Sequence, residues 1–179
     1  SITFTTGTQA IGQGHETSFP QIVSDLLGVP AESIRYRAGD TGLIAKGGGH
    51  GSSRATFMAG TAIWHAVDEI KNKGKRIAAQ MLEAAEADID FADGAFTVTG
   101  TDRSVGLMQA AAQARETGEP LDTYHLWERE HHTFPNGCHV AEVEIDPETG
   151  VVRLDRYTAV DDYGTVINPM LIQGQMHGA

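Results

Sequence analysis

The chain has 179 residues, enough for one good-sized domain or two small ones, and its 40% hydrophobic content is ordinary for a globular protein. Its 13 basic and 24 acidic residues give a net charge of −11, which argues against a nucleic acid or an anionic membrane surface as the main partner. One cysteine, Cys138, excludes an intrachain disulfide, and no stretch is apolar enough to cross a bilayer, so a cytoplasmic location is expected, with the periplasm as the alternative.

The first half of the sequence predicts two strands and two helices. Residues 2–6 alternate and are rich in β-branched side chains, which predicts a strand, and residues 15–27 carry apolar side chains on one helical face. Residues 33–37 predict a second strand. After a glycine-rich loop, a helical pattern runs from Ser53 to about Ala87, and the polar residues 71–75 are expected to break or kink this helix.

The second half of the sequence is predicted to be mostly β. A hairpin is expected at 89–98, around the turn Ala92-Asp93-Gly94, and a short amphipathic helix at 104–115. Residues 134–137 are expected to form a turn, followed by strands at 139–145 and 151–160, and a helix is expected to begin near Pro169. Helices and strands without regular β-α-β alternation indicate an α+β fold with mixed helices and mainly antiparallel sheets.

A glycine-rich loop, Lys46-Gly47-Gly48-Gly49-His50-Gly51-Ser52-Ser53-Arg54, directly precedes the long helical pattern. The start of a helix offers unpaired backbone N–H groups and a partial positive charge, and Ser52 and Ser53 are candidates to cap it. Together with the Arg54 guanidinium, this arrangement suits a phosphate or pyrophosphate. The loop is neither a P-loop nor a dinucleotide fingerprint, because Ser52 stands where both motifs need glycine. A plain structural turn is the alternative.

Other kinds of chemistry have weaker support in the sequence. Three histidines and the cysteine lie close together in one stretch, namely His131, His132, Cys138 and His139. They give only weak support for a metal site, because zinc prefers paired ligands such as Cys-x-x-Cys with His-x-x-x-His. A Cys138 nucleophile would need a histidine nearby in space, which the sequence does not establish. Gln13 and Gln175 stand beside glycines, and an amide group suits the holding of an oxo ligand or the edge of a heterocycle.

Three motifs, taken in order, resemble one family. They are Gly12-Gln13-Gly14-His15-Glu16-Thr17, the stretch from Gly47 to Thr56, and Asp161-Asp162-Tyr163-Gly164-Thr165-Val166-Ile167-Asn168-Pro169 followed by Gly174-Gln175-Met176-His177-Gly178. This pattern is similar to the molybdenum hydroxylases, which include the large subunits of the xanthine dehydrogenase, aldehyde oxidase and carbon monoxide dehydrogenase types. The segment from Ala141 to Val152 fits the strand–turn–strand of that family, and the resemblance covers essentially the whole chain.

The resemblance implies a molybdopterin cofactor with molybdenum, in bacteria often as molybdopterin cytosine dinucleotide, whose pterin holds the metal without protein ligands. It places Gly12, Gln13 and Gly14 near the molybdenum or the pterin. Residues of the second loop would bind the pyrophosphate and nucleotide, and these are Gly49, His50, Gly51, Ser52, Ser53 and Arg54. Gln175 would approach the metal from the other side.

The family reaction is the hydroxylation of a C–H bond of an aldehyde or N-heterocycle with water. The resemblance implies electron transfer through iron–sulfur clusters and FAD on partner domains or subunits, and a general-base glutamate that lies outside this chain and is not Glu16. We expect residues 1–179 to be the second half of the molybdopterin-binding domain, truncated before its C-terminal part. Alone, the chain is expected to be inactive, to bind cofactor poorly and to self-associate. The alternative is a non-catalytic α+β interaction or nucleotide-binding module.

Overall fold

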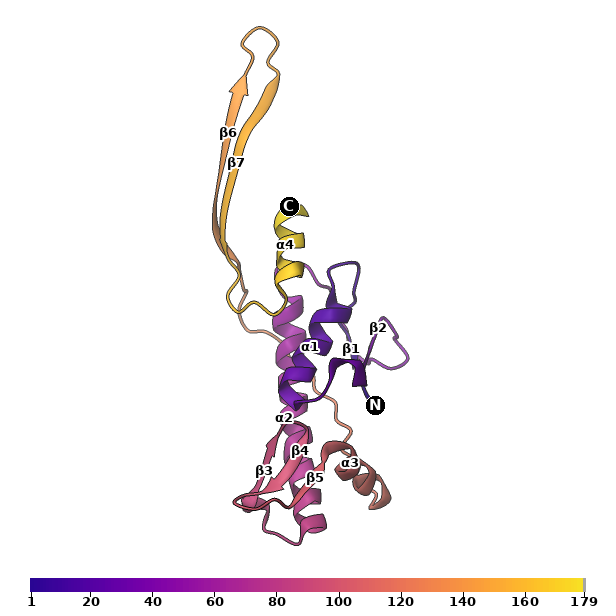
Figure 1. Ribbon diagram of the computed structural model, residues 1–179. Helices are drawn as coiled ribbons and strands as arrows, with labels where there is room; N and C mark the ends of the chain where they lie inside the picture. The colour runs from indigo at the N-terminus through magenta and orange to yellow at the C-terminus, as the bar shows by residue number, and fades with distance from the viewer. Residues whose placement is uncertain (179) are drawn as a thin grey trace.

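Helices and strands are intermixed in the computed structural model, which describes residues 1–178 (Figure 1). Two short 3₁₀ turns, Ala31–Ser33 and Glu86–Asp88, precede strands. The remaining elements, in chain order, are β1 (Ile2–Thr6), α1 (His15–Leu27), β2 (Ile34–Ala38), α2 (Ala55–Leu82), β3 (Ile89–Ala92), β4 (Ala95–Val98), β5 (Ser104–Gly106), α3 (Leu107–Glu116), β6 (Asn136–Ile145), β7 (Val152–Asp162) and α4 (Pro169–Gly178).

The long helix α2 is the spine of the structure (Figure 1). Helix α1 packs against α2, while the small sheet β3–β4–β5 and helix α3 pack toward the other end of α2. The largest fully buried side chains come from both groups of elements, namely Phe19 and Leu27 of α1, Ile89 of β3 and Phe96 of β4. Burial of this apolar surface provides the main driving force that fixes α2 against its neighbours.

The three sheets confirm the predicted α+β class. Strands β3, β4 and β5 form one antiparallel sheet, and β6 and β7 form another. Strands β1 and β2 pair in parallel, from Ile2 opposite Ile34 to Thr6 opposite Ala38. Parallel pairing is possible because the crossover through α1 brings the chain back to the end of the sheet at which β1 begins. This parallel pair is the exception in a mainly antiparallel protein.

Two helix predictions are corrected by the structure. Helix α2 runs unbroken through residues 71–75 and ends at Leu82 rather than near Ala87. Gly74 does not break it, because this glycine faces the ring of Phe96 in the core. Residues 104–106 form strand β5 rather than the start of a helix, since Val105 is buried opposite Phe96 in the sheet, and helix α3 begins only at Leu107.

The C-terminal third departs from the body of the protein. Strands β6 and β7 form a long hairpin that projects beyond the helices, and α4 lies above the N-terminal end of α2 (Figure 1). Strand β6 begins at Asn136, so part of the turn expected at 134–137 is already strand. Helix α4 begins as predicted, with Pro169 as its first residue and the Asn168 side chain accepting a hydrogen bond from the backbone N–H of Leu171, at 3.1 Å. None of the helices in residues 1–178 combines the length and apolar character that a membrane span requires.

Candidate functional site

Two glycine loops, the first at 7–14 between β1 and α1 and the second at 46–54 before α2, lie against each other in the structure. A single parallel bridge joins Thr8 to Gly48, and the backbone N–H of Gly48 donates to the carbonyl of Gly7 at 3.3 Å. The Tyr36 hydroxyl of β2 donates to the carbonyl of Thr8 at 3.3 Å, which ties the first loop to the parallel sheet. The start of the first loop therefore lies against the second loop, although Thr8 and Gly48 are 40 residues apart in sequence.

The third motif meets the first loop at Gly14. This residue has φ of +78°, and a side chain added there would start 2.4 Å from Cδ2 of Leu171 on α4. The Asn168 side chain also donates to the Gln21 side chain of α1 at 3.0 Å. Gln175 lies one helical turn after Leu171, on the same face of α4. The structure thus brings Gln175 to the side of α4 that contacts the first loop, where its own side chain is exposed.

Ser52 and Ser53 do not cap α2 as the sequence suggested. The helix begins at Ala55, its N-cap residue is Arg54, and no side chain caps it. Both serines instead take left-handed backbone conformations, with φ of 61° and 47°, which are costly for residues other than glycine. Their backbone carbonyls accept hydrogen bonds from the segment before β6. Thr133 Oγ1 donates to the carbonyl of Ser53 at 2.6 Å, and the Arg129 guanidinium donates to the carbonyl of Ser52 at 3.4 Å.

Arg54 directly precedes α2, and its charge is not matched by a carboxylate within residues 1–178. Its Nε donates to the carbonyl of Gly49 at 2.9 Å, which orients the guanidinium along the glycine loop. Among residues 1–178 it has no carboxylate within ion-pair distance, whereas Lys46 on the same loop pairs with Glu128. The uncapped first turn of α2 adds free N–H groups and a partial positive charge beside it. Together they form a site that favours an anionic group.

Gln13 is held by its own loop. Its Oε1 accepts from the backbone N–H of Ile11 at 2.5 Å, and its Nε2 donates to the carbonyl of Gln9 at 3.2 Å. Gly12 beside it has φ of +107° and faces open space, as does Gly51 in the second loop. The backbone is therefore open to close approach from outside at both loops.

His15 is a candidate site residue that the sequence analysis did not select. It begins α1, is 4% exposed, and stacks on Phe19 with ring centroids 4.4 Å apart. Its Nδ1 has no hydrogen-bond partner within residues 1–178. Burial lowers the pKa of His15 below 6.5, with Glu16 opposing and His50 of the second loop reinforcing the shift. Phe19, four residues after His15 and so on the same face of the helix, is the sequence feature that could have predicted the burial of His15.

The buried His15 predicts acid sensitivity in the cofactor-free protein. Because its folded-state pKa lies below the unfolded value, its contribution to stability is present above about pH 6.5 and is lost as the pH falls from there toward the folded-state pKa. Thermal melts at graded pH should show this loss, and a His15→Gln variant should show a smaller one. An equal loss in both proteins would exclude His15 as its source.

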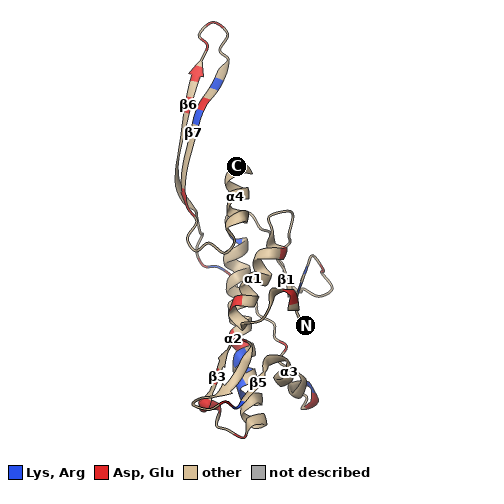
Figure 2. Ribbon diagram, viewed as in Figure 1, with Lys and Arg blue, Asp and Glu red and all other residues tan. Residues whose placement is uncertain are grey.

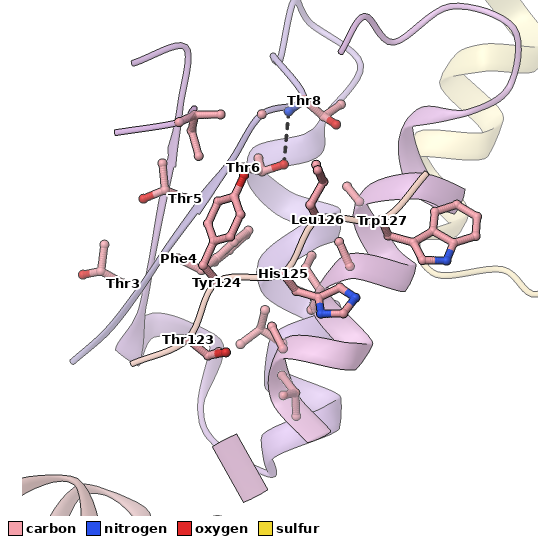
Figure 3. A pocket seen from close by; sticks show the side chains of 18 of the residues that line it. Thr3, Phe4, Thr5, Thr6, Thr8, Thr123, Tyr124, His125, Leu126 and Trp127 are labelled. Atoms are coloured by element: carbon pink, nitrogen blue, oxygen red, sulfur yellow. Dashed lines mark hydrogen bonds between the residues drawn. The ribbon is translucent and has the colours of Figure 1, made fainter. Parts of the chain in front are cut away.

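A cavity of about 680 Å³, part of whose lining is drawn in Figure 3, borders the second glycine loop and Arg54. Its walls come from β1, from α2 and from the extended segment 121–129, whose side chains Tyr124, His125 and Trp127 lie along it. His125 stacks on His65 of α2, with ring centroids 4.6 Å apart. Neither Gln13 nor Gln175 lines this cavity, so the glutamines and the cavity lie at different parts of the surface.

The four residues considered as zinc ligands do not form a metal site. Within the described part of the chain, no group of three or more histidine, cysteine or acidic side chains is placed to hold a metal ion. The His139 ring is instead within hydrogen-bond distance of Tyr157 and Asp161, at 2.6 and 2.9 Å. Cys138 is exposed and precedes His139 on β6, so the two side chains point to opposite faces of the strand.

The fold and these loops define a class of protein, an α+β domain with two glycine loops, an uncapped helix start and an arginine that has no carboxylate partner within residues 1–178. The chain belongs to the molybdopterin cofactor-binding domain family, whose model matches residues 1–179. The resemblance to the molybdenum hydroxylases found in the sequence is therefore confirmed.

Relatives of known kind support this assignment. The chain is 41% identical over 178 residues to the carbon monoxide dehydrogenase large chain of Hydrogenophaga pseudoflava, covering 96% of this chain and 22% of that protein. It is 36% identical to the nicotine 6-hydroxylase large subunit of Paenarthrobacter nicotinovorans, covering 99% of this chain and 23% of that one. The solved structure of reconstituted CO dehydrogenase from Oligotropha carboxidovorans matches with a TM-score of 0.82 at 37% identity, over 98% of this chain and 23% of that chain. The chain thus spans less than a quarter of the length of these relatives.

Proposed function

We propose that residues 1–179 bind the molybdopterin cofactor, in dinucleotide form, within the large chain of a molybdenum-dependent oxidoreductase. The observation that carries this proposal is the convergence of the three motifs, in which the first loop contacts the second at Thr8–Gly48 and α4 at Gly14–Leu171. A cofactor with a pterin at one end and a nucleotide at the other needs polar groups from several loops on one surface. The family match supports the cofactor-binding function rather than a non-catalytic interaction module.

The residues present fit such a group. Arg54 and the free N–H groups of the first turn of α2 would hold a pyrophosphate, with Gly49, His50, Gly51, Ser52 and Ser53 forming the loop around it. Gly12, Gln13 and Gly14 would face the pterin, and Gln175 would approach from α4. The partnerless Nδ1 of His15, buried beside the first loop, is a polar atom that the described residues leave without a bond, so a ligand is a suitable partner for it.

The cofactor, when bound, supplies the redox chemistry that hydroxylates a C–H bond with water as the oxygen source. The residues of this chain bind and orient it, and the general-base glutamate lies elsewhere in the complete large chain.

We propose an aldehyde or an N-heterocycle as substrate, and one relative is named for its action on nicotine, itself an N-heterocycle. Two of these relatives are named as a large chain or a large subunit, which supports the presence of partner subunits, and we propose that those subunits carry the iron–sulfur clusters and FAD. A cytoplasmic location stays a prediction, as do the assignment to the second half of the domain and the inactivity of the isolated chain.

Metal and nucleotide analysis of the complete large chain tests the proposal. We expect molybdenum by mass spectrometry and a cytosine nucleotide released by acid, from protein made in a host that synthesises the cofactor. A well-folded protein from such a host that holds neither would contradict the proposal, and the glycine loop would then be a structural turn or a site for another anion.

A further inference from the structure

The hairpin β6–β7 has two chemically different faces. Residues paired across the two strands point to the same face of the hairpin. The register shifts at a bulge between Glu142 and Val143, and paired residues beyond this bulge still share a face. One face carries charge, where Arg153 pairs with Glu144 and Arg156 with Glu142 at 3.7 Å. Figure 2 shows both signs of charge on the two strands. The other face carries no charge in its outer part, which we call the distal apolar face: Ala141, Val143, Ile145, Val152, Leu154 and Tyr157.

The distal apolar face is exposed to solvent along its whole length. Val143 is 53% exposed, Leu154 57% and Ile145 60%. Polar side chains on the opposite face already make cross-strand ion pairs, so the hairpin has the alternation of a sheet that is buried on one side. A two-stranded hairpin alone is marginally stable in water, and a continuous apolar patch of this kind marks a surface made for contact.

Side-chain hydrogen bonds join the two strands at the root of the hairpin. His139 lies within hydrogen-bond distance of both Tyr157 and Asp161, and the Tyr163 hydroxyl donates to the other oxygen of Asp161 at 3.1 Å. These bonds join both strands to the start of the segment that leads into α4. These contacts therefore fix the pairing of the two strands at the root of the hairpin.

The solved structure of CO dehydrogenase contains a similar fold within a much longer chain. The match with CO dehydrogenase covers 98% of this chain and only 23% of that chain. The unmatched residues here are too few to include the whole hairpin. More than three quarters of the relative's polypeptide is therefore available to contact a hairpin of the same fold. A face with no charge in its outer part also resembles a domain interior more than the polar surface through which separately folded partners meet.

We propose that the distal apolar face packs against the part of the large chain that lies outside residues 1–179, and so completes a sheet or core that this segment only begins. The contact is intramolecular and independent of the cofactor. Two other occupants, a partner subunit and a second copy of the same chain, are alternatives that an experiment separates.

Thiol labelling of the complete large chain, purified without other subunits, tests this proposal. In a Cys138→Ser background, Val143→Cys on the distal apolar face is compared with Glu144→Cys, its neighbour on the charged face. Labelling is followed at the peptide level by mass spectrometry and normalised to the urea-unfolded chain. We expect position 143 to label about tenfold more slowly than position 144, or slower still, because a covered side chain reacts only after opening. Leu154→Cys against Arg153→Cys repeats the comparison if the first pair impairs folding.

Each other outcome would overturn the proposal. Equal labelling at both positions would mean that the large chain does not cover the face. Protection that appears only after the partner subunits are added would assign the face to one of them, and protection that falls on dilution would assign it to a second copy. None of these readouts depends on molybdenum, so the result is separate from that of the cofactor analysis.

Discussion

Arg54→Ala is expected to weaken retention of the cofactor by the complete large chain roughly ten- to hundredfold. A hydrogen bond to a charged group contributes about 1.5–3 kcal/mol, and about 1.4 kcal/mol corresponds to a factor of ten in affinity. Arg54 is the residue whose loss should matter, because its guanidinium has no carboxylate partner within residues 1–178 and is already oriented by the Gly49 carbonyl. Molybdenum and nucleotide per polypeptide, measured after dialysis over a dilution series, report the change.

A matched control separates a lost cofactor contact from a lost positive charge. Arg103 is exposed and directly precedes β5, a strand of the small sheet that packs toward the end of α2 away from the glycine loops (Figure 1). Arg103→Ala should retain cofactor like the unmodified protein, and circular dichroism should show both variants folded. Full retention by Arg54→Ala would remove the guanidinium from the binding site and leave the backbone amides of α2 as the anion site.

Gly74→Ala is expected to destabilise the protein by about 1–3 kcal/mol, although glycine inside a helix is ordinarily the less stable choice. A methyl group at this position would start 2.2 Å from Cζ of Phe96, and three atoms of that ring lie within 3.0 Å of it. Phe96 is fully buried and cannot retreat, since it also packs on Phe91 with ring centroids 4.7 Å apart. The expected change is a lower midpoint in denaturant or thermal unfolding of the complete chain.

The same helix supplies the control for this prediction. At Gly60, a methyl group would meet only Ile22 Cδ1 at 3.8 Å, an ordinary van der Waals distance. Gly60→Ala should therefore raise stability, by up to about 1 kcal/mol. Adding Phe96→Leu to Gly74→Ala should recover part of the loss by shortening the opposing side chain. If Gly74→Ala were as stabilising as Gly60→Ala, the close packing of α2 on β4 would be wrong.

Local signals in the sequence predicted most elements, and the errors occurred where a distant residue decides the local structure. The strand at 2–6, the helix at 15–27 and the hairpin at 89–98 follow from periodicity and turn residues, and the structure has them. The break expected at 71–75 is absent because Phe96, 22 residues further on, occupies the space that Gly74 leaves. Residues 104–106 are strand because Val105 finds a partner in Phe96 of β4, which no local pattern of that stretch shows.

The site shows the same division. Residue types and their order pointed to the two glycine loops, to Arg54 and to the family. The family model confirms the family. Their positions before the helix predicted Ser52 and Ser53 as caps, whereas both take left-handed conformations and their carbonyls accept hydrogen bonds from Thr133 and Arg129. No local pattern marks His15 as a site residue, because its importance comes from its burial and from a ring nitrogen that has no hydrogen-bond partner within residues 1–178.

The sequence by itself therefore determined the α+β class, the motifs and the cofactor family, because these depend on residue types and on spacing within one stretch of chain. Only the tertiary structure decided that the first loop contacts both the second loop and α4, that Gly14 leaves room for Leu171, and that one face of the β6–β7 hairpin has no partner within residues 1–178. These features depend on contacts between residues far apart in the chain, and such contacts are set by the packing of the core rather than by local preference.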